Sequence, residues 1–281
     1  MKKSALVLEG GAKRGIYTAG VLDVLLENGI SVDGVIGVSA GAIHGCSFVS
    51  KQIGRSIRYN LNYGNDYRFM SFRSWLLSGN MVDTQFCYHE LPEKLDPFDN
   101  KTFLKSNTKF YVVVSNIESG MPEYIHCKDM FADIDYLRAS ASMPFVSKIV
   151  ELNGKKYLDG GICDSIPLSG AQKSGFEKNI VIATRPSGYR KKPFCFKWLV
   201  KLIYKKYPNF VKAMINRHIM YNNELEKIEL LASKKEILLI RPSKFINISK
   251  MESNLNIVKE MYELGRKDAY THLEQIKNFL E

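Results

Sequence analysis

Val35-Ile36-Gly37-Val38-Ser39-Ala40-Gly41-Ala42-Ile43 indicates the fold class of the chain. It reads as a short apolar strand, a Gly-x-Ser-x-Gly turn and the start of a helix rich in small residues. Gly37 and Gly41 remove the side chains that would collide where a strand and a helix meet at a sharp angle. Ser39 then lies at the bend, its hydroxyl directed outward near the positive end of the helix. The stretch alone fits either a nucleophile elbow or a Ser/Gly-rich turn that caps a helix.

Strands and helices alternate around this turn. Residues 4–8 and 34–38 are predicted strands, joined by a helix over about 16–27 that ends at Gly29. Such a unit predicts a parallel sheet with a right-handed crossover. Residues 52–105 are aromatic and read as irregular. Further strands are predicted at 110–115, 122–127, 148–152, 155–158, 179–184 and 236–241, and helices at 132–142, 207–233 and 251–279. We expect one α/β domain over residues 1–281, with basic helical additions at about 190–281.

Length and composition restrict the class of protein. The chain has 281 residues, of which 45% are apolar, enough for a full hydrophobic core. No apolar run reaches 18 residues, and the first apolar run is too short for a signal peptide because Glu9 interrupts it. The five cysteines are scattered, with no Cys-x-x-Cys pair, which predicts reduced thiols rather than a zinc site. We therefore expect a cytoplasmic protein.

A second glycine-rich stretch, Gly10-Gly11-Ala12-Lys13-Arg14-Gly15, follows the first predicted strand. It fails as a phosphate-binding P-loop, because Ile16 stands where that motif requires lysine. It also departs from the dinucleotide fingerprint, which needs a second glycine at Ala12 and an acid after the second strand.

An oxyanion hole is the third interpretation of this loop. Acyl transfer places negative charge on the former carbonyl oxygen, and preorganised backbone N–H groups at a helix start stabilise it. Adjacent parallel strands present their carboxyl ends together, so a loop after the first strand lies beside Ser39. The candidate donors are the amides of Gly10, Gly11, Ala12, Lys13 and Arg14, and the side chains of Lys13 and Arg14 add positive charge.

A serine nucleophile also needs a base. None of the five histidines follows a late strand, as the base of an α/β-hydrolase triad does. Asp159 ends a predicted strand and precedes Gly160 and Gly161, which allow a close approach. A carboxylate is a weak base at its reference pKa of about 4, but it accepts a proton when it bonds directly to the hydroxyl in a water-poor site. Asp-Gly-Gly is also typical of a simple turn.

The three motifs, in this order, resemble those of the patatin-like phospholipase family. The segment Arg138–Pro144 resembles the small-residue stretch that its members carry before the aspartate, and Thr184–Arg190 resembles a bacterial cytosolic branch. The resemblance implies a three-layer α/β/α fold with a mostly parallel sheet, a dyad of Ser39 and Asp159, and a glycine-rich oxyanion loop. Ala12 departs from the third glycine that many members have.

The net charge of +11 comes from one segment of the chain. Between Lys178 and Asn223 there are eleven basic residues and no acidic one. Within it, Lys197, Lys201 and Lys205 recur at helical spacing beside apolar and aromatic residues. The segment fits a core-packed helix with one solvated face. It also fits an interfacial helix that contacts an anionic membrane, which would place the protein peripherally on the inner membrane surface. No nucleic-acid motif is present.

The leading hypothesis is a serine lipid acyl hydrolase that needs neither a metal nor an organic cofactor. Ser39 attacks the ester carbonyl, Asp159 acts as base, and loop amides hold the oxyanion. Three alternatives remain: acyl transfer to an alcohol with the same dyad, a non-catalytic lipid-binding protein, and a dinucleotide-binding oxidoreductase.

Overall fold

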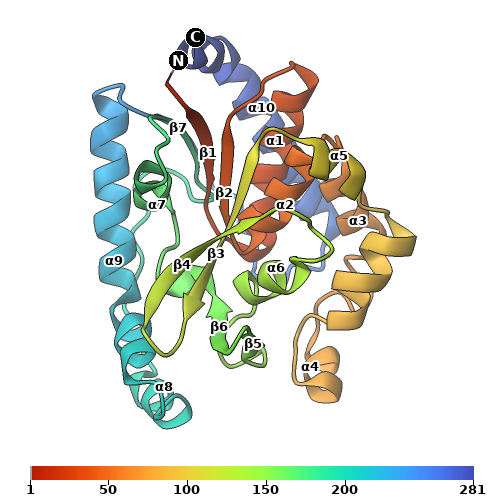
Figure 1. The fold of residues 1–281 in the computed structure, drawn as a ribbon, viewed down its shortest axis with the longest axis vertical. Coiled ribbons are helices and arrows are strands. Elements are labelled where there is room, and N and C mark those ends of the chain that lie inside the picture. Colours follow the sequence, from red (N-terminus) through yellow and green to blue (C-terminus); the bar gives the residue numbers. More distant parts are fainter. Residues whose placement is uncertain (1) are drawn as a thin grey trace.

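A computed structural model describes residues 2–281 of the chain (Figure 1). Its strands are β1 (Ser4–Leu8), β2 (Gly34–Val38), β3 (Lys109–Asn116), β4 (Met121–Cys127), β5 (Val150–Leu152), β6 (Lys155–Asp159), β7 (Lys178–Ile182) and β8 (Leu238–Ile240). They form one sheet in the order β5-β6-β3-β2-β1-β7-β8, with β4 paired to β3 beside this path. The five central strands β3, β2, β1, β7 and β8 are parallel, while β4, β5 and β6 run antiparallel to their neighbours.

Helices cover both faces of the sheet (Figure 1). The α-helices are α1 (Ile16–Glu27), α2 (Ala40–Val49), α3 (Arg55–Tyr63), α4 (Phe72–Ser78), α5 (Asn100–Lys105), α6 (Ile134–Ser140), α7 (Leu168–Lys173), α8 (Lys197–Ile203), α9 (Pro208–Ser233) and α10 (Leu255–Leu280). Two short 3₁₀ helices, η1 (Ala12–Gly15) and η3 (Gly160–Ile162), and one π-helix, η2 (Phe86–Leu95), complete the helical elements of the described residues. α1, α2 and α10 lie on one face and α7 and α9 on the other, so the predicted three-layer fold is confirmed.

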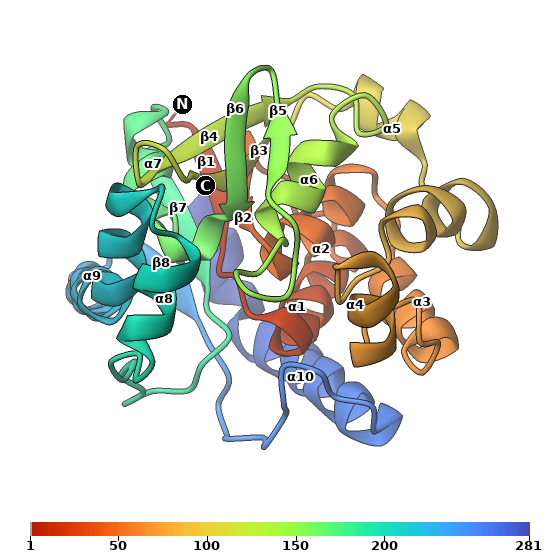
Figure 2. The ribbon, with the colours of Figure 1, turned by 90° about the horizontal axis from the view of Figure 1, so that it is seen from below.

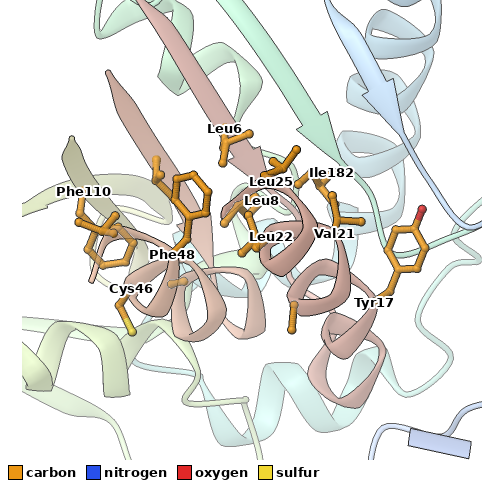
Figure 3. Packing of buried hydrophobic residues seen from close by; sticks show 14 of the residues in the cluster. Leu6, Leu8, Tyr17, Val21, Leu22, Leu25, Cys46, Phe48, Phe110 and Ile182 are labelled. Carbon is orange, nitrogen blue, oxygen red and sulfur yellow. The ribbon is translucent and has the colours of Figure 1, made fainter. Parts of the chain in front are cut away.

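The central strands are buried on both faces, which explains their continuous apolar sequences. Successive side chains of a strand point to opposite faces of the sheet. In β1, Leu6 and Leu8 therefore face α1 and α2, whereas Ala5 and Val7 join the core beneath α7 and α9. Figure 3 shows the first of these cores, in which the two leucines pack with Val21, Leu22, Leu25, Phe48, Phe110 and Ile182.

The last helix packs backbone to backbone against the first. A Cβ on Gly20 of α1 would lie 2.1 Å from the carbonyl oxygen of Tyr262, and one on Gly265 of α10 would lie 2.1 Å from that of Tyr17. The two tyrosines also form hydrogen bonds across the contact. Tyr17 Oη donates to Asp268 of α10 at 3.0 Å, and Tyr262 Oη donates to Asp23 of α1 at 2.8 Å. The C-terminal helix is thus built into the central core.

The prediction that residues 52–105 are irregular was wrong, since they contain α3, α4, η2 and α5. In α3 the buried positions recur with helical spacing, but they are Arg55, Ser56, Tyr59 and Asn60. The helix thus has one buried face, but the residues on that face are mostly polar, so the sequence shows no helical spacing of apolar residues. The predicted strand 148–152 also begins two residues later, at Val150.

Two further features concern the described part of the chain. No helix between residues 2 and 281 has the combination of length and apolar character needed to cross a bilayer. Over the same range, all five cysteines are unpaired, and no group of three or more His, Cys, Asp or Glu residues is arranged to hold a metal ion.

Candidate active site

Ser39 lies at a strained bend between β2 and α2. Its backbone has φ 52° and ψ −121°, a conformation that non-glycine residues seldom adopt. The flanking glycines permit this bend, because a Cβ on Gly37 would lie 2.5 Å from Ala42 Cα and one on Gly41 would lie 2.5 Å from Leu8 O. The structure therefore places Ser39 on a sharp strand-to-helix turn of the kind that presents a nucleophile.

The structure brings Ser39 and Asp159 together. Ser39 Oγ donates a hydrogen bond to Asp159 Oδ2 at 3.0 Å, across 120 residues of sequence. The other carboxylate oxygen accepts the N–H of Gly161 at 2.8 Å. Asp159 ends β6, which pairs with β3 in antiparallel fashion. The next residue, Gly160, lies so close to β3 that a Cβ on it would be 2.1 Å from Val113 O. Gly160 is therefore needed to seat the aspartate, and Gly161 to orient it.

The charge state of Asp159 depends on opposing effects. Burial raises the pKa of this carboxyl above its usual value, because it disfavours the charged form. The positive charge of Arg217, the Gly161 N–H and the Ser39 hydroxyl act in the opposite direction and lower the pKa. The result is a buried carboxylate that is more basic than one in water and already points at the hydroxyl.

The glycine loop divides its amides into used and free donors. The N–H of Gly10 donates to Ser165 O at 3.3 Å, and that of Arg14 donates to Gly11 O at 3.1 Å. Within residues 2–281, the amides of Gly11, Ala12 and Lys13 donate to no protein acceptor. The loop adjoins the nucleophile, since a Cβ on Gly10 would lie 3.3 Å from Ser39 Cβ. Of the five predicted oxyanion donors, three are thus available.

Ala12 is the loop residue that departs from the resembled glycine-rich pattern. Its φ is 49°, which lies in the left-handed region that favours glycine. The loop conformation is thus kept despite the methyl group, and the Ala12 amide remains one of the free donors.

A cavity of about 140 Å³ opens beside the loop and the serine. Ser39, Ala12 and Lys13 form part of its wall. Most of the remaining lining is apolar or aromatic, including Ile16, Ile43, Tyr59, Phe69, Met70, Val82, Tyr88, Leu91, Phe98, Ile134, Leu137 and Met143. Such a lining suits an aliphatic chain whose polar end lies at Ser39.

Among residues 2–281, Lys13 supplies the one ammonium group in the wall of this cavity. Its Nζ donates to Asn60 Oδ1 at 3.0 Å and lies 4.5 Å from the centre of the Phe69 ring. Burial lowers the pKa of this lysine to about 8, against a smaller opposing effect of Cys87. Lys13 therefore places a costly positive charge near Ser39.

The histidines make no part of the Ser39–Asp159 pair. Among the described residues, none hydrogen-bonds to either side chain. His44 lines the cavity, but its Nδ1 pairs with Ser56 Oγ at 3.0 Å, and burial lowers its pKa to about 3. It is neutral at physiological pH.

Two positioning residues were not identified from the sequence. Ser140 Oγ accepts the N–H of Ser39 at 2.8 Å and donates to Val113 O at 2.6 Å, so it ties the elbow to β3. Arg217 of α9 donates from Nε to Gly161 O and contacts Ser165 Oγ at 3.4 Å. The small-residue stretch 138–144 contains the first of these, whereas nothing in the sequence pointed to Arg217.

The basic segment is only partly as predicted. Lys197 and Lys201 lie on α8, but Lys205 lies beyond its last residue, so the three-lysine stripe on one helix was wrong. α8 ends at Ile203 and α9 begins at Pro208, so a short turn separates the two helices, and Tyr207, the residue before the proline, has φ −128° and ψ 69°, outside helical geometry. Val200 packs inward, whereas the apolar side chains of Trp198, Leu202 and Ile203 are 65%, 61% and 51% exposed.

Comparison with known proteins identifies the family of the chain. A family model described as patatin-like phospholipase matches residues 6–171, which include all three motifs. A second model, described as a domain of unknown function (DUF6363), matches residues 207–281. The uncharacterized protein YjjU of Escherichia coli is 30% identical over 273 residues, covering 93% of this chain and 74% of YjjU. The chain belongs to the patatin-like phospholipase family, and this membership supports a lipid acyl hydrolase.

More distant relatives are much longer proteins. The lysophospholipase nte1 of Aspergillus terreus is 24% identical over 299 residues, which cover 97% of this chain but 18% of that protein. NTE1 of Saccharomyces cerevisiae, also a lysophospholipase, is 27% identical over 176 residues, covering 60% of this chain and 10% of its own. Among solved structures, VipD from Legionella pneumophila aligns over 98% of this chain and 67% of its own, with 12% identity and a TM-score of 0.47.

Proposed function

We propose that this protein is a serine hydrolase of lipid acyl esters, with Ser39 as nucleophile and Asp159 as general base. The observation that carries the proposal is the 3.0 Å hydrogen bond from Ser39 Oγ to Asp159 Oδ2 at the wall of an apolar cavity. A nucleophile in direct contact with its base, beside unoccupied amide donors, is the arrangement that acyl transfer requires.

The proposed reaction has two halves. In the first, Ser39 Oγ attacks the ester carbonyl carbon while its proton moves to Asp159 Oδ2, and the amides of Gly11, Ala12 and Lys13 stabilise the oxyanion. The tetrahedral intermediate then collapses, the C–O bond to the alcohol breaks, and the alcohol takes the proton from Asp159. In the second half, Asp159 removes a proton from water as it attacks the acyl-enzyme. The fatty acid then leaves and Ser39 recovers its proton.

The aspartate is suited to this role by its surroundings. Because burial raises its pKa, the driving force for removing the hydroxyl proton is larger than for a carboxylate in water. The positive charge of Arg217, which bonds to the carbonyl of Gly161, lowers the pKa of Asp159 and so opposes the effect of burial. Activity is therefore expected to decline as pH falls through the raised pKa of Asp159, without a histidine titration.

The substrate is an ester of a single aliphatic chain in this proposal. The apolar cavity accommodates such a chain, and the longer relatives nte1 and NTE1 carry the name lysophospholipase. A lysophospholipid is thus the favoured substrate class.

Peripheral contact with an anionic membrane forms part of the same proposal. The exposed apolar residues of α8 lie beside Lys197, Lys201 and Lys205. α4 exposes Phe72, Leu76 and Leu77 at 62%, 76% and 72%. Both helices lie at the end of the molecule away from the two termini (Figure 1), and they face the viewer from below (Figure 2). Together they provide apolar side chains for insertion and lysines for acidic head groups.

Hydrolysis of a p-nitrophenyl ester of medium chain length tests the dyad. Ser39→Ala and Asp159→Asn, each folded, should both lose at least about a thousandfold in kcat/KM, as members of a catalytic unit do. Ser233→Ala, an exposed serine at the end of α9, is the matched control and should keep wild-type activity. Full activity in either dyad variant would exclude the proposed mechanism.

A further inference from the structure

Five basic side chains whose charges act on one another lie outside the lining of the apolar cavity. They are Arg14, Arg185, Lys191, Arg217 and Lys250. Four of them lie beyond residue 171, where the match to the patatin-like phospholipase model ends. Apart from Arg217, the side chains of this cluster have no role in the proposed hydrolysis of a simple ester, which raises the question of what their charges bind.

Hydrogen bonds and ring contacts fix most of the cluster around Glu9 and α9. Arg217 holds the carbonyl of Gly161, next to the base. Lys191 Nζ lies 4.4 Å from the centre of the Tyr221 ring, and Tyr221 Oη donates to Glu9 at 2.8 Å. The main chain of Lys191 is tied to α9 through Asn222, at 2.8 and 3.1 Å.

Arg185 joins the same surface through aromatic contacts. Its guanidinium carbon lies 4.3 Å from the centre of the Tyr189 ring, which packs edge-on against Tyr221 at 6.0 Å. Lys250, in the loop before α10, is exposed, and its charge acts on Arg14, Arg217 and Asp159.

The cluster carries more positive than negative charge. Within residues 2–281, none of the five basic groups forms an ion pair with a carboxylate. Glu9 is buried and already accepts hydrogen bonds from Tyr221 Oη and the Thr184 N–H. Arg14 Nε and Thr184 Oγ1 are buried and have no partner in the described part of the chain. Five positive charges held beside the carboxylates of Glu9 and Asp159 leave a net preference for an anion.

The pKa values of two members reflect this crowding. Burial lowers the pKa of Lys191 to about 7, and the charges of Arg217, Arg14 and Lys250 contribute in the same direction. Burial and the neighbouring Arg185 lower the pKa of Arg14. A negative charge bound among them would oppose both shifts.

The cluster and the cavity lie on different sides of the glycine loop. Side chains of consecutive residues in a 3₁₀ helix project about 120° apart. In η1, Lys13 enters the cavity wall, whereas Arg14 does not line it and lies near Glu9 and Arg185. A substrate whose ester carbonyl is at Ser39 and whose acyl chain fills the cavity would extend its alcohol portion toward the cluster.

We propose that these five residues bind the phosphate of the substrate's head group, which makes the preferred substrate a phosphate-bearing acyl ester rather than a neutral one. This inference rests on the proposed hydrolase. It also gives the C-terminal region a role, because Arg217 and Lys250 lie within residues 207–281.

A matched pair of substrates tests the assignment: decanoyl lysophosphatidylcholine and 1-decanoylglycerol, which share the acyl chain and differ in the phosphate head group. In Lys191→Gln/Lys250→Gln, the ratio of kcat/KM for the phospholipid to that for the neutral ester should fall at least about tenfold. Both residues are in loops and away from the Gly161 contact, so the base is left in place. Lys192→Gln, an exposed neighbour outside the cluster, is the control and should keep the wild-type ratio.

The outcomes separate this inference from the proposed function. An unchanged ratio in the double variant, with Ser39-dependent hydrolysis of both esters, overturns the head-group assignment alone. Loss of neither ester in Ser39→Ala overturns the hydrolase, and the head-group assignment falls with it. Inorganic phosphate should compete with the phospholipid in wild type and do so less well in the double variant. Inhibition by phosphate combined with an unchanged ratio would assign the cluster to free phosphate instead of a lipid.

Discussion

Lys13 lies with its ammonium group in the wall of an apolar cavity, and its own amide is one of the three free donors of the glycine loop. Its folded pKa of about 8 is below the ordinary value of 10.5. Between these two values the unfolded chain binds more protons than the folded one, so the contribution of this group to stability improves as pH rises. At neutral pH the charged form costs on the order of 3 kcal/mol. A residue kept at such a cost is expected to serve the site.

Replacement of Lys13 by methionine tests this cost. Between pH 7 and pH 10.5, the unfolding free energy of wild type should rise by about 3 kcal/mol relative to that of Lys13→Met. The wild type regains stability over that range and the variant does not. Chemical denaturation at both pH values gives the difference, with Lys51→Met as an exposed control that should show little change. A pH-independent difference would contradict the depressed pKa.

At the scale of single elements, α8 and α4 present side chains that a water-facing helix seldom carries. Leu76 of α4 and Trp198 of α8 are 76% and 65% exposed. Each helix is short and has one buried residue, so its packing on the protein is slight. Helices of this kind fit a role at a lipid surface, where apolar side chains insert and adjacent lysines meet acidic head groups.

Charge reversal in α8 tests the membrane contact. Lys197→Glu/Lys201→Glu should weaken co-sedimentation with vesicles of 30% anionic lipid by at least about tenfold, since each lysine near such a surface contributes about 1 kcal/mol. Lys234→Glu/Lys235→Glu, at the opposite end of α9, is the matched control and should bind as wild type does. Equal binding of wild type to neutral vesicles would refute the electrostatic part of the proposal.

At the scale of the whole molecule, the C-terminal helix completes the core that the first strand begins. Val258, Met261, Leu264 and Ile276 of α10 belong to the same cluster as Leu6. We propose on this basis that residues 1–281 fold as one unit, although a separate family model describes residues 207–281.

Gly265→Ala tests how strongly the two ends of the chain depend on each other. In an ordinary exposed helix, alanine is more favourable than glycine. Here its Cβ would lie 2.1 Å from Tyr17 O, so the variant should lose at least about 2 kcal/mol of unfolding free energy and still unfold in one transition. Glu263→Ala, exposed on the same helix, should change stability by less than about 0.5 kcal/mol. A second, separate transition in Gly265→Ala would contradict the single-unit proposal.

The sequence predicted the parts of the fold that local chemistry determines. The strand, turn and helix around Ser39 follow from glycine spacing and apolar runs, and the Asp159 motif ends a predicted strand. The helices between residues 52 and 105 were missed because polar residues such as Arg55 and Asn60 occupy their buried positions. The support of Asp159 by Arg217 was missed because it joins segments 56 residues apart through a backbone carbonyl.

The central claim concerns the reactivity of one hydroxyl group. Incubation with an alkyl fluorophosphonate, followed by peptide mass spectrometry, measures it directly. We expect stoichiometric labelling of Ser39 in wild type, no labelling in Ser39→Ala, and a rate lowered at least about a thousandfold in Asp159→Asn, in which the base is lost. Labelling at another residue, or an undiminished rate in Asp159→Asn, would contradict the dyad.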